Sequence, residues 1–226
     1  PIGIKLCIGH RWEFLAICKA IVAEGTGPDF VVIDGAEGGT AAAPMEFPDH
    51  VGMPLREGLV FAHNALLGYD LRDKIRLAAS GKIITGFRLA ANLALGADWC
   101  NSARGFMFSL GCVQSLKCHT NRCPTGITTQ SRTRQRGLDI ADKSQRVANF
   151  HRETVTTLGQ IMRAAGISEP SELQPHHLYR RLSATEIRRF DDLYPTVARG
   201  SLLKAPPRDW VAGCREACVD SFQRAG

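Results

Sequence analysis

Residues 29–35 read DFVVIDG, and this stretch decides the fold class of the chain. Four apolar residues, three of them β-branched, stand in a row without polar alternation, which indicates a strand buried on both faces. An Asp-Gly pair follows and marks a turn at the end of the strand. Strands of this kind belong to parallel sheets that helices cover, so residues 29–35 predict an α/β fold.

The same strand signal recurs on both sides of this stretch and alternates with apolar residues at helical spacing. Such an alternation implies a parallel sheet whose strands are joined by helical crossovers. The further strands are expected at residues 2–8, 74–81 and 98–105, and the helices at 12–24, 55–68 and 84–96.

Two architectures satisfy this alternation, an open doubly wound sheet and a (β/α)8 barrel. Each predicted strand runs into a loop of functional composition, and a barrel collects its chemistry at the carboxyl ends of all its strands. An open sheet concentrates its chemistry at one switch point instead. We therefore expect the C-terminal half of a (β/α)8 barrel over residues 1–111, with the other half in a preceding part of a larger protein. A loop over residues 112–130 and a helical C-terminal extension over residues 131–226 are expected to follow.

Composition narrows the class of protein. The net charge is +6 at pH 7, but the arginines are concentrated after residue 130 without interleaved aromatics. This pattern argues against nucleic-acid binding and leaves docking of an acidic redox partner as a use for the basic surface. No run approaches 18 apolar residues, so we expect no membrane span. The scattered cysteines favour a reducing compartment, and we expect the cytoplasm.

Three cysteines crowd into the stretch GCVQSLKCHTNRCPTG at residues 111–126, namely Cys112, Cys118 and Cys123. Their short, odd-numbered spacing does not suit disulfides, and the polar residues between them do not suit a core. A metal site is the preferred interpretation. Three thiolates suit an iron-sulfur cluster that lacks one corner iron, and zinc with His119 as fourth ligand is the alternative.

Two later loops have the composition of a phosphate cradle. The loop SGKIITG at residues 80–86 offers glycines for close backbone approach and a lysine, and the loop SARG at residues 102–105 offers backbone N–H groups and a guanidinium. In a barrel, the loops after the last two strands often bind phosphate. The candidate residues are Gly81, Lys82, Thr85, Gly86, Ala103 and Arg104.

These motifs together resemble the FMN-binding glutamate synthase family, that is, the synthase domain of the glutamate synthase large subunit and, more closely, its stand-alone members. The resemblance covers roughly residues 1–130, and the later part is similar to the tail of the stand-alone members. It implies an FMN-binding barrel and a [3Fe-4S] cluster held by the three cysteines. The motifs that carry it are DGAEGGTAAAP at 34–44, SGKIITG at 80–86, GADWCNSARGFMFSLGC at 96–112 and CPTGITTQ at 123–130.

The resemblance also implies a flavin and substrate site. Lys5, within the first predicted strand, is expected to point into the barrel mouth and stabilise the anionic reduced flavin, the alternative being a lysine that reaches solvent. Asp34 and Glu37 are expected to face flavin and substrate as catalytic residues, although an Asp at a strand end is often only a cap. The next loop residues are expected to contact the flavin, and they are Gly38, Gly39 and Thr40.

The implied reaction is the reduction of 2-iminoglutarate, formed from 2-oxoglutarate and ammonia, to L-glutamate. Electrons would enter through the cluster from ferredoxin or a reductase subunit, and an amidotransferase subunit is a possible ammonia source. The family reads GGTGASP and DGGLKTG where this chain has GGTAAAP and SGKIITG. These substitutions leave open which oxo acid is the substrate. Two alternatives stay open, a related flavoprotein acting on another amine or oxo acid, as in N-methylglutamate synthesis, and a zinc-stapled phosphate-binding module without redox activity.

The C-terminal part has a different pattern. Residues 142–166 place apolar side chains on one helical face and predict a long amphipathic helix. Ser183 and Glu186 have capping-box spacing, so a further helix is expected at residues 183–190. Cys214 and Cys218 stand four residues apart on an expected helix and are interpreted as incidental. These helices are expected to cover the barrel.

Overall fold

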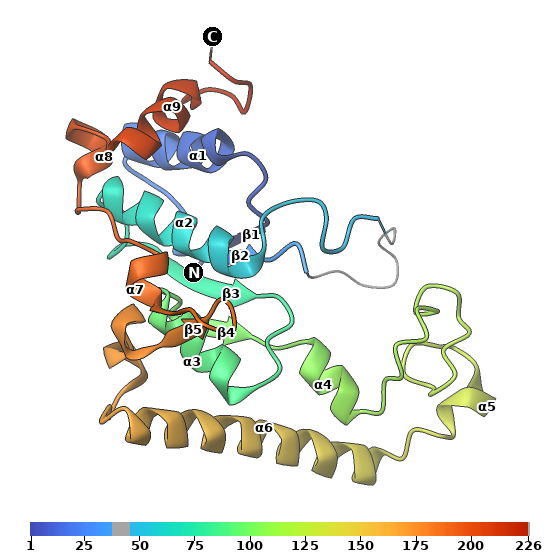
Figure 1. The fold of residues 1–226 in the computed structure, drawn as a ribbon. Coiled ribbons are helices and arrows are strands. Elements are labelled where there is room, and N and C mark those ends of the chain that lie inside the picture. Colours follow the sequence, from blue (N-terminus) through green and yellow to red (C-terminus); the bar gives the residue numbers. More distant parts are fainter. Residues whose placement is uncertain (38–45, 226) are drawn as a thin grey trace.

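The stretch at residues 29–35 lies in a four-stranded parallel sheet (Figure 1). We describe residues 1–37 and 46–225 of a computed structural model. The strand order is β1-β2-β3-β4, so the sheet follows the order of the chain. Its members are β1 (Gly3–Leu6), β2 (Phe30–Asp34), β3 (Arg76–Ser80) and β4 (Trp99–Asn101).

The first three helices cover one face of this sheet. Alternate residues of the two central strands, Val31 and Ile33 on β2 with Leu77 on β3, are 1 % exposed or less and join the helices in one apolar core. The intervening residues lie on the opposite face, where Phe30 meets the ring of Trp99 edge-on with centroids 5.6 Å apart. The covering helices are α1 (Arg11–Glu24), α2 (Leu55–Gly68) and α3 (Gly86–Ala94).

This arrangement confirms the predicted parallel α/β sheet with helical crossovers. Neither β1 nor β4 has a second neighbouring strand among the described residues, so both are edges of the sheet. Closure of the sheet into an eight-stranded barrel stays a prediction.

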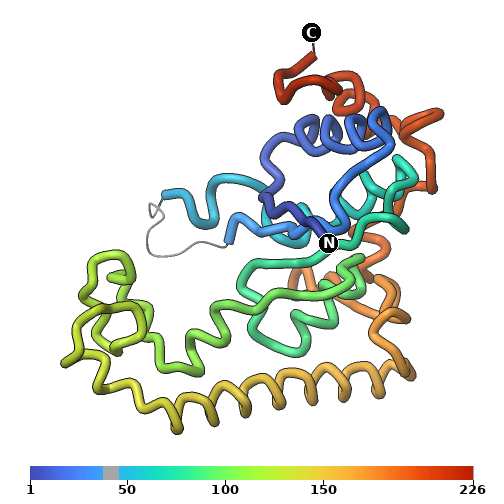
Figure 2. Tube along the Cα trace, turned by 180° about the vertical axis from the view of Figure 1, so that it is seen from behind, coloured from blue at the N-terminus to red at the C-terminus, as the bar shows by residue number. Residues whose placement is uncertain are grey.

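After β4 the chain forms the short helix α4 (Arg104–Ser109), the cysteine-containing loop, and the helices α5 (Arg132–Gln135) and α6 (Ile140–Ala164). Helix α6 confirms the predicted amphipathic helix, and Asp139 caps it by accepting a hydrogen bond from the Asp142 amide at 2.9 Å. Seen from behind, it runs from the region of the cysteine-containing loop to the C-terminal part of the chain (Figure 2). It packs on α3 and α4, where Phe150 meets Phe106 edge-on.

Residues 169–225 form the last part of the chain, to which the name extension is restricted from here on. It packs on the outer side of the first helices, with α9 against α1 and α8 against α2. Its elements are the 3-10 helices η1 (Pro170–Glu172) and η2 (Pro175–His177), the strands β5 (Tyr179–Arg181) and β6 (Ile187–Arg189), and the helices α7 (Phe190–Leu193), α8 (Ser201–Lys204) and α9 (Arg208–Glu216).

The predicted helix at residues 183–190 is wrong. The hydroxyl of Ser183 does accept hydrogen bonds from the amides of Thr185 and Glu186, at 3.3 and 3.1 Å, as a helix cap would. However, these bonds close a turn between the antiparallel strands β5 and β6, and the chain leaves the turn extended. A serine that binds amides two and three residues ahead stabilises a turn equally well, so the spacing does not distinguish the two structures.

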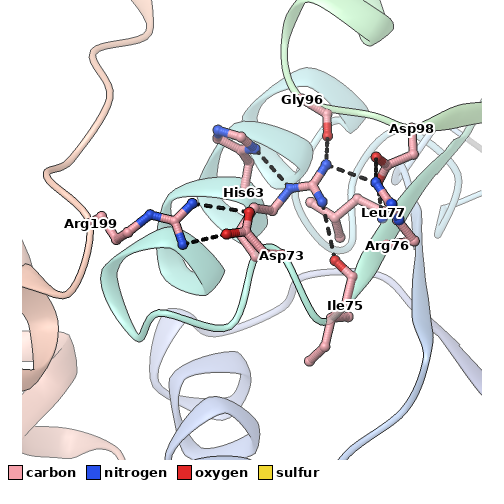
Figure 3. A network of polar contacts seen from close by, with 9 residues as sticks. His63, Asp73, Ile75, Arg76, Leu77, Gly96, Asp98 and Arg199 are labelled. Carbon is pink, nitrogen blue, oxygen red and sulfur yellow. Dashed lines mark hydrogen bonds and ion pairs between the residues drawn. The ribbon is translucent and has the colours of Figure 1, made fainter. Parts of the chain in front are cut away.

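Polar contacts over long sequence distances hold the extension in place. The Asn64 side chain on α2 donates to the Pro195 carbonyl at 3.0 Å and accepts from the Val197 amide at 3.2 Å. Arg199 forms an ion pair with Asp73 at 2.7 Å, near the end of α2 (Figure 3). The extension is thereby attached to the same helix that covers the centre of the sheet.

Arg72 joins the amino ends of β3 and β4 to α2. Arg72 donates to the Gly96 carbonyl and to the Asp98 carboxylate, both at 2.9 Å, and to Nδ1 of His63 at 3.3 Å. Burial, together with the positive charge of Arg72, lowers the pKa of His63 to about 4. The imidazole is therefore neutral at physiological pH.

The two cysteines near the C-terminus lie at different positions relative to α9. Cys214 lies on α9 and accepts a 3.8 Å hydrogen bond from the Tyr69 hydroxyl, whereas Cys218 lies beyond the end of the helix. The two thiols are therefore not paired on one helical face.

Over the described residues, no helix is both long and apolar enough to cross a membrane, as the sequence predicted.

Candidate functional site

The carboxyl ends of the strands bring together two of the predicted catalytic residues. Lys5 on β1 is registered with Val32 of β2, so it projects from the face of the sheet that the helices do not cover. Asp34, two residues further along β2, shares that face. Their side chains form an ion pair with an Nζ–Oδ2 distance of 2.7 Å, and Lys5 remains 59 % exposed. The pair presents an accessible ammonium group at the carboxyl edge of the sheet.

Cys7 lies beside this pair and was missed as a candidate. Its sulfur is directed at the carbonyls of Ile8 and Met53, at 3.9 and 3.8 Å. Burial and the negative charge of Asp34 raise the pKa of the Cys7 thiol. The thiol is therefore protonated at neutral pH, and its position inside an apolar run gave no signal of proximity to Asp34.

Glu37, the third predicted catalytic residue, is bound to the start of a helix. Its carboxylate accepts hydrogen bonds from the Leu55 amide at 2.9 and 3.1 Å, and Leu55 is the first residue of α2. A carboxylate at a helix N-terminus is stabilised by unpaired amides and by the helix dipole. The predicted flavin contacts Gly38, Gly39 and Thr40, together with the substituted Ala41 and Ala43, lie outside the described residues.

The loop after β3 lies against the loop after β2. The Gly35 amide donates to the Ser80 carbonyl at 2.8 Å. Gly81 has φ +146°, and a Cβ there would lie 3.3 Å from the Gly35 nitrogen, so the two backbones are in close contact. Lys82 also has a positive φ, of 45°, and its ammonium group forms an ion pair with Asp49 at 3.0 Å. The sequence gave no local signal for this partner, 33 residues away.

The two loops of the predicted phosphate cradle are joined to each other. The hydroxyl of Ser102, just after β4, donates to the Ile83 carbonyl at 2.6 Å. Thr85 caps α3 by accepting from the Arg88 amide at 3.2 Å. The sequence motif gave no indication of this role for Ser102, whose hydrogen bond holds the two loops together.

The starts of α3 and α4 both lie near this junction and both abut α6. A Cβ on Gly86, the first residue of α3, would lie 2.8 Å from the Leu158 nitrogen. Ala103 and Arg104 stand at the start of α4, directly after Ser102. Helix α6 therefore fixes where the amides of both helix starts lie.

This geometry fits the phosphate end of a flavin nucleotide. The backbone amides at two helix starts and the left-handed glycine at position 81 are the parts that close approach of a phosphate requires. The ammonium group of Lys82 is already neutralised by Asp49. The donor set of such a cradle is thus mainly backbone.

The three cysteines of the predicted cluster lie in different environments. Cys112 is half-buried, Cys118 is exposed and Cys123 is buried. Burial alone would raise the pKa of Cys123, but the Thr125 hydroxyl, 3.4 Å from its sulfur, and the Thr128 amide lower that pKa to about 6. These hydrogen bonds favour the thiolate of Cys123.

The cysteines do not converge on one point. Among residues 1–37 and 46–225, no group of three or more His, Cys, Asp or Glu side chains is placed to hold a metal ion. The cluster and the zinc alternative with His119 therefore stay predictions that rest on the spacing of the cysteines.

Comparisons with known proteins agree with the sheet and its loops. The family described as "Conserved region in glutamate synthase" matches residues 1–168. The chain is 40% identical over 193 residues to the glutamate synthase large subunit-like protein YerD of Bacillus subtilis, covering 85% of this chain and 37% of YerD. It is 33% identical over 174 residues to the archaeal glutamate synthase (NADPH) of Methanocaldococcus jannaschii, covering 77% of this chain and 33% of that protein.

Among solved structures, a flavocytochrome b2 variant with pyruvate bound aligns with a TM-score of 0.45 and 19% identity, over 77% of this chain and 33% of that one. This likeness is too weak to assign a fold. The chain spans about a third of the length of the two curated relatives named above. The match to the family extends over most of the chain and includes every residue of the sheet and its loops, and on that ground the chain belongs to the glutamate synthase family.

Proposed function

We propose that this chain is part of a flavoprotein oxidoreductase of the glutamate synthase type, which reduces 2-iminoglutarate, formed from 2-oxoglutarate and ammonia, to L-glutamate. The observation that carries the proposal is the Lys5–Asp34 pair at the carboxyl edge of a sheet whose whole length matches the family. Barrel enzymes place their catalytic residues at this edge.

In this proposal Lys5 provides a fixed positive charge. Asp34 holds the ammonium group at 2.7 Å, so the lysine is oriented before substrate arrives. FMN, when bound, would supply the hydride that reduces the C=N bond of the imino acid. The ammonium group of Lys5 would lie against the electron-rich end of the flavin ring, while Asp34 and Glu37 would attract the positively charged imino group.

The phosphate of FMN is assigned to the joined loops. The amides of Gly81, Gly86 and Ala103 would donate to the phosphate oxygens, with the guanidinium of Arg104 as the charged partner. Thr85 would keep the start of α3 in place through its capping bond. Lys82 is bound to Asp49, so we assign it a supporting role. Gly38, Gly39 and Thr40 complete the proposed flavin contacts.

The proposal also assigns a [3Fe-4S] cluster to Cys112, Cys118 and Cys123. It rests on the C-x5-C-x4-C spacing of these three cysteines. In the same proposal the protein is located in the cytoplasm. Its electrons come from a ferredoxin or a reductase subunit, and its ammonia comes from an amidotransferase subunit. We expect Cys118→Ser to remove the iron of the anaerobically purified whole protein and Cys100→Ser to retain it. Unchanged iron in Cys118→Ser would contradict the cluster assignment.

The reaction is tested in the whole protein through Lys5. Glutamate formation from 2-oxoglutarate, ammonia and a chemical reductant is measured for Lys5→Met, Lys5→Arg and the control Lys74→Met. We expect Lys5→Met to lower kcat by about 100-fold, Lys5→Arg to recover part of it, and the exposed control to match the parent. Equal activity of Lys5→Met and Lys74→Met would overturn the role of Lys5, and absence of glutamate formation in the FMN-loaded parent would overturn the reaction.

A further inference from the structure

A cavity borders the candidate site and lies between the start of α2, the helix α3 and the strand β5 of the extension. Its volume is 340 Å³, within the range of small-ligand sites. Glu37 and Gly81, which also belong to the candidate site, form part of its wall. The lining residues that bear on its chemistry are Glu37, Arg56, Glu57, Arg88, Asn92 and Arg180.

Three guanidinium groups line this cavity. Arg88 donates to the Lys82 carbonyl at 2.7 Å, and Arg180 donates to the Tyr194 hydroxyl at 3.1 Å. Arg56 lies over the ring of Phe190, 5.5 Å from its centroid. Within the described part of the chain, no carboxylate forms an ion pair with any of these three arginines. Their positive charges are therefore available to a ligand.

Two carboxylates stand on the same wall. Glu37 is bound to the Leu55 amide, and Glu57 accepts a 3.4 Å hydrogen bond from the Tyr194 hydroxyl. With three positive and two negative groups, the cavity has a small net positive charge and offers partners to both signs. A ligand that carries only negative charge would be repelled by the two carboxylates of the cavity. The lining therefore favours a zwitterion with an excess negative charge.

Asn92 supports the wall of the cavity. The residue is 4% exposed, and its Nδ2 donates to the Arg88 carbonyl at 2.7 Å. This bond holds in place the backbone from which the Arg88 side chain projects.

We propose that this cavity binds a small amino acid with an acidic side chain. The two carboxylates of such a ligand match the planar guanidinium forks, and its ammonium group matches the Glu57 carboxylate. Arg180 comes from the extension whereas Arg88 comes from α3, so the ligand would bridge the extension to the sheet-covering helices. The cavity shares Glu37 and Gly81 with the candidate site, but the side chains of Arg88 and Arg180 have no role in the reaction proposed above, so binding here is tested separately from that reaction.

Calorimetric titration of the whole protein with L-aspartate tests the proposal. We expect saturable binding at one site, and binding weaker by about tenfold or more for succinate, which lacks the ammonium group, and for L-alanine, which lacks the second carboxylate. Inorganic phosphate serves as a probe for simple anion binding. Phosphate or succinate binding as tightly as L-aspartate would overturn the assignment to an amino acid.

Variants locate the binding. Arg180→Gln is expected to weaken L-aspartate binding by about tenfold, whereas Arg181→Gln, its neighbour on β5, removes the same charge outside the cavity and is expected to leave the affinity unchanged. Glu57→Gln should reduce the discrimination between L-aspartate and succinate, with circular dichroism as the check on folding. Equal affinities of Arg180→Gln and Arg181→Gln, with both folded, would place any binding elsewhere and overturn the proposal.

Discussion

The strand–helix layer of residues 3–109 and the extension of residues 169–225 are stabilised in different ways. The layer has one continuous apolar core, in which Leu59 and Leu77 are 0% exposed. The extension adds to this core a few anchors that lie far apart in the sequence, such as Phe190 at 1% and Leu202 at 6% exposure, and exposed turns and polar contacts join them. Local sequence pattern therefore determines the layer, whereas the extension depends on the surface that the layer provides.

The largest expected effect is truncation inside the layer. Phe14 on α1 is 3% exposed and meets Phe61 edge-on at 6.2 Å. We expect Phe14→Ala to lower the free energy of unfolding by about 4 kcal/mol, because it removes apolar contacts and leaves a cavity. Urea unfolding followed by circular dichroism measures it. Phe87→Ala, at a 43% exposed position, should cost less than about 1 kcal/mol, and equal costs would contradict a single layer core.

A smaller and more local effect is expected in the extension. Phe190→Ala should destabilise it by about 3 kcal/mol, since the ring packs on Arg56 of α2 and on Tyr194. Amide hydrogen exchange should show faster exchange in β5, β6 and α7 with protection kept in β2 and β3. Phe222→Ala, at 62% exposure, is the matched control. Equal loss of protection in the sheet would show that the two regions unfold together.

The pH dependence of stability tests the junction between the regions, where His63 lines a cavity with residues of the extension. The His63 imidazole has a pKa of about 6.5 in the unfolded chain and of about 4 in the folded chain. The stabilisation from neutral His63 is therefore complete above pH 6.5 and is lost as the pH falls towards 4, by at most about 3 kcal/mol.

Replacement of His63 isolates this effect. His63→Gln keeps a side-chain acceptor for Arg72 but does not titrate. Its unfolding free energy should depend less on pH between 6.5 and 4, by up to about 1.4 kcal/mol per pH unit. Unfolding by urea at several pH values measures the two slopes. Identical slopes for the parent and the variant would show that His63 is not the titrating group.

How much the sequence predicts follows the same division between regions. The buried run of residues 29–35 and the repeated strand–helix pattern predict the sheet, since the periodicity of an element is a local property. The Lys5–Asp34 pair follows from two strands in parallel register. The partner of Lys82 does not follow, because Asp49 reaches it through a folded loop. The arrangement of the three cysteines in space cannot be predicted either, because a loop with given intervals between its cysteines can adopt many conformations.

The smallest expected effect concerns the turn where the sequence pattern predicts a helix and the structure has a hairpin. The hydroxyl of Ser183 accepts from the Thr185 and Glu186 amides, and the cross-strand pair Arg180 and Arg188 opposes two positive charges. The hairpin therefore depends on the turn more than on its strand pairing.

Ser183→Ala should destabilise this hairpin by about 1 kcal/mol, because two amides lose their acceptor, while Ser183→Thr keeps the hydroxyl and should be near neutral. Hydrogen exchange of the Glu186 and Leu182 amides is the measurement, since Leu182 donates to the Glu186 carbonyl across the turn at 2.9 Å. Exchange in β3 should stay unchanged in both variants. If Ser183→Ala instead left these amides as protected as in the parent, the turn would be held by the surface of the layer, and the extension would be governed by that surface even at its most local element.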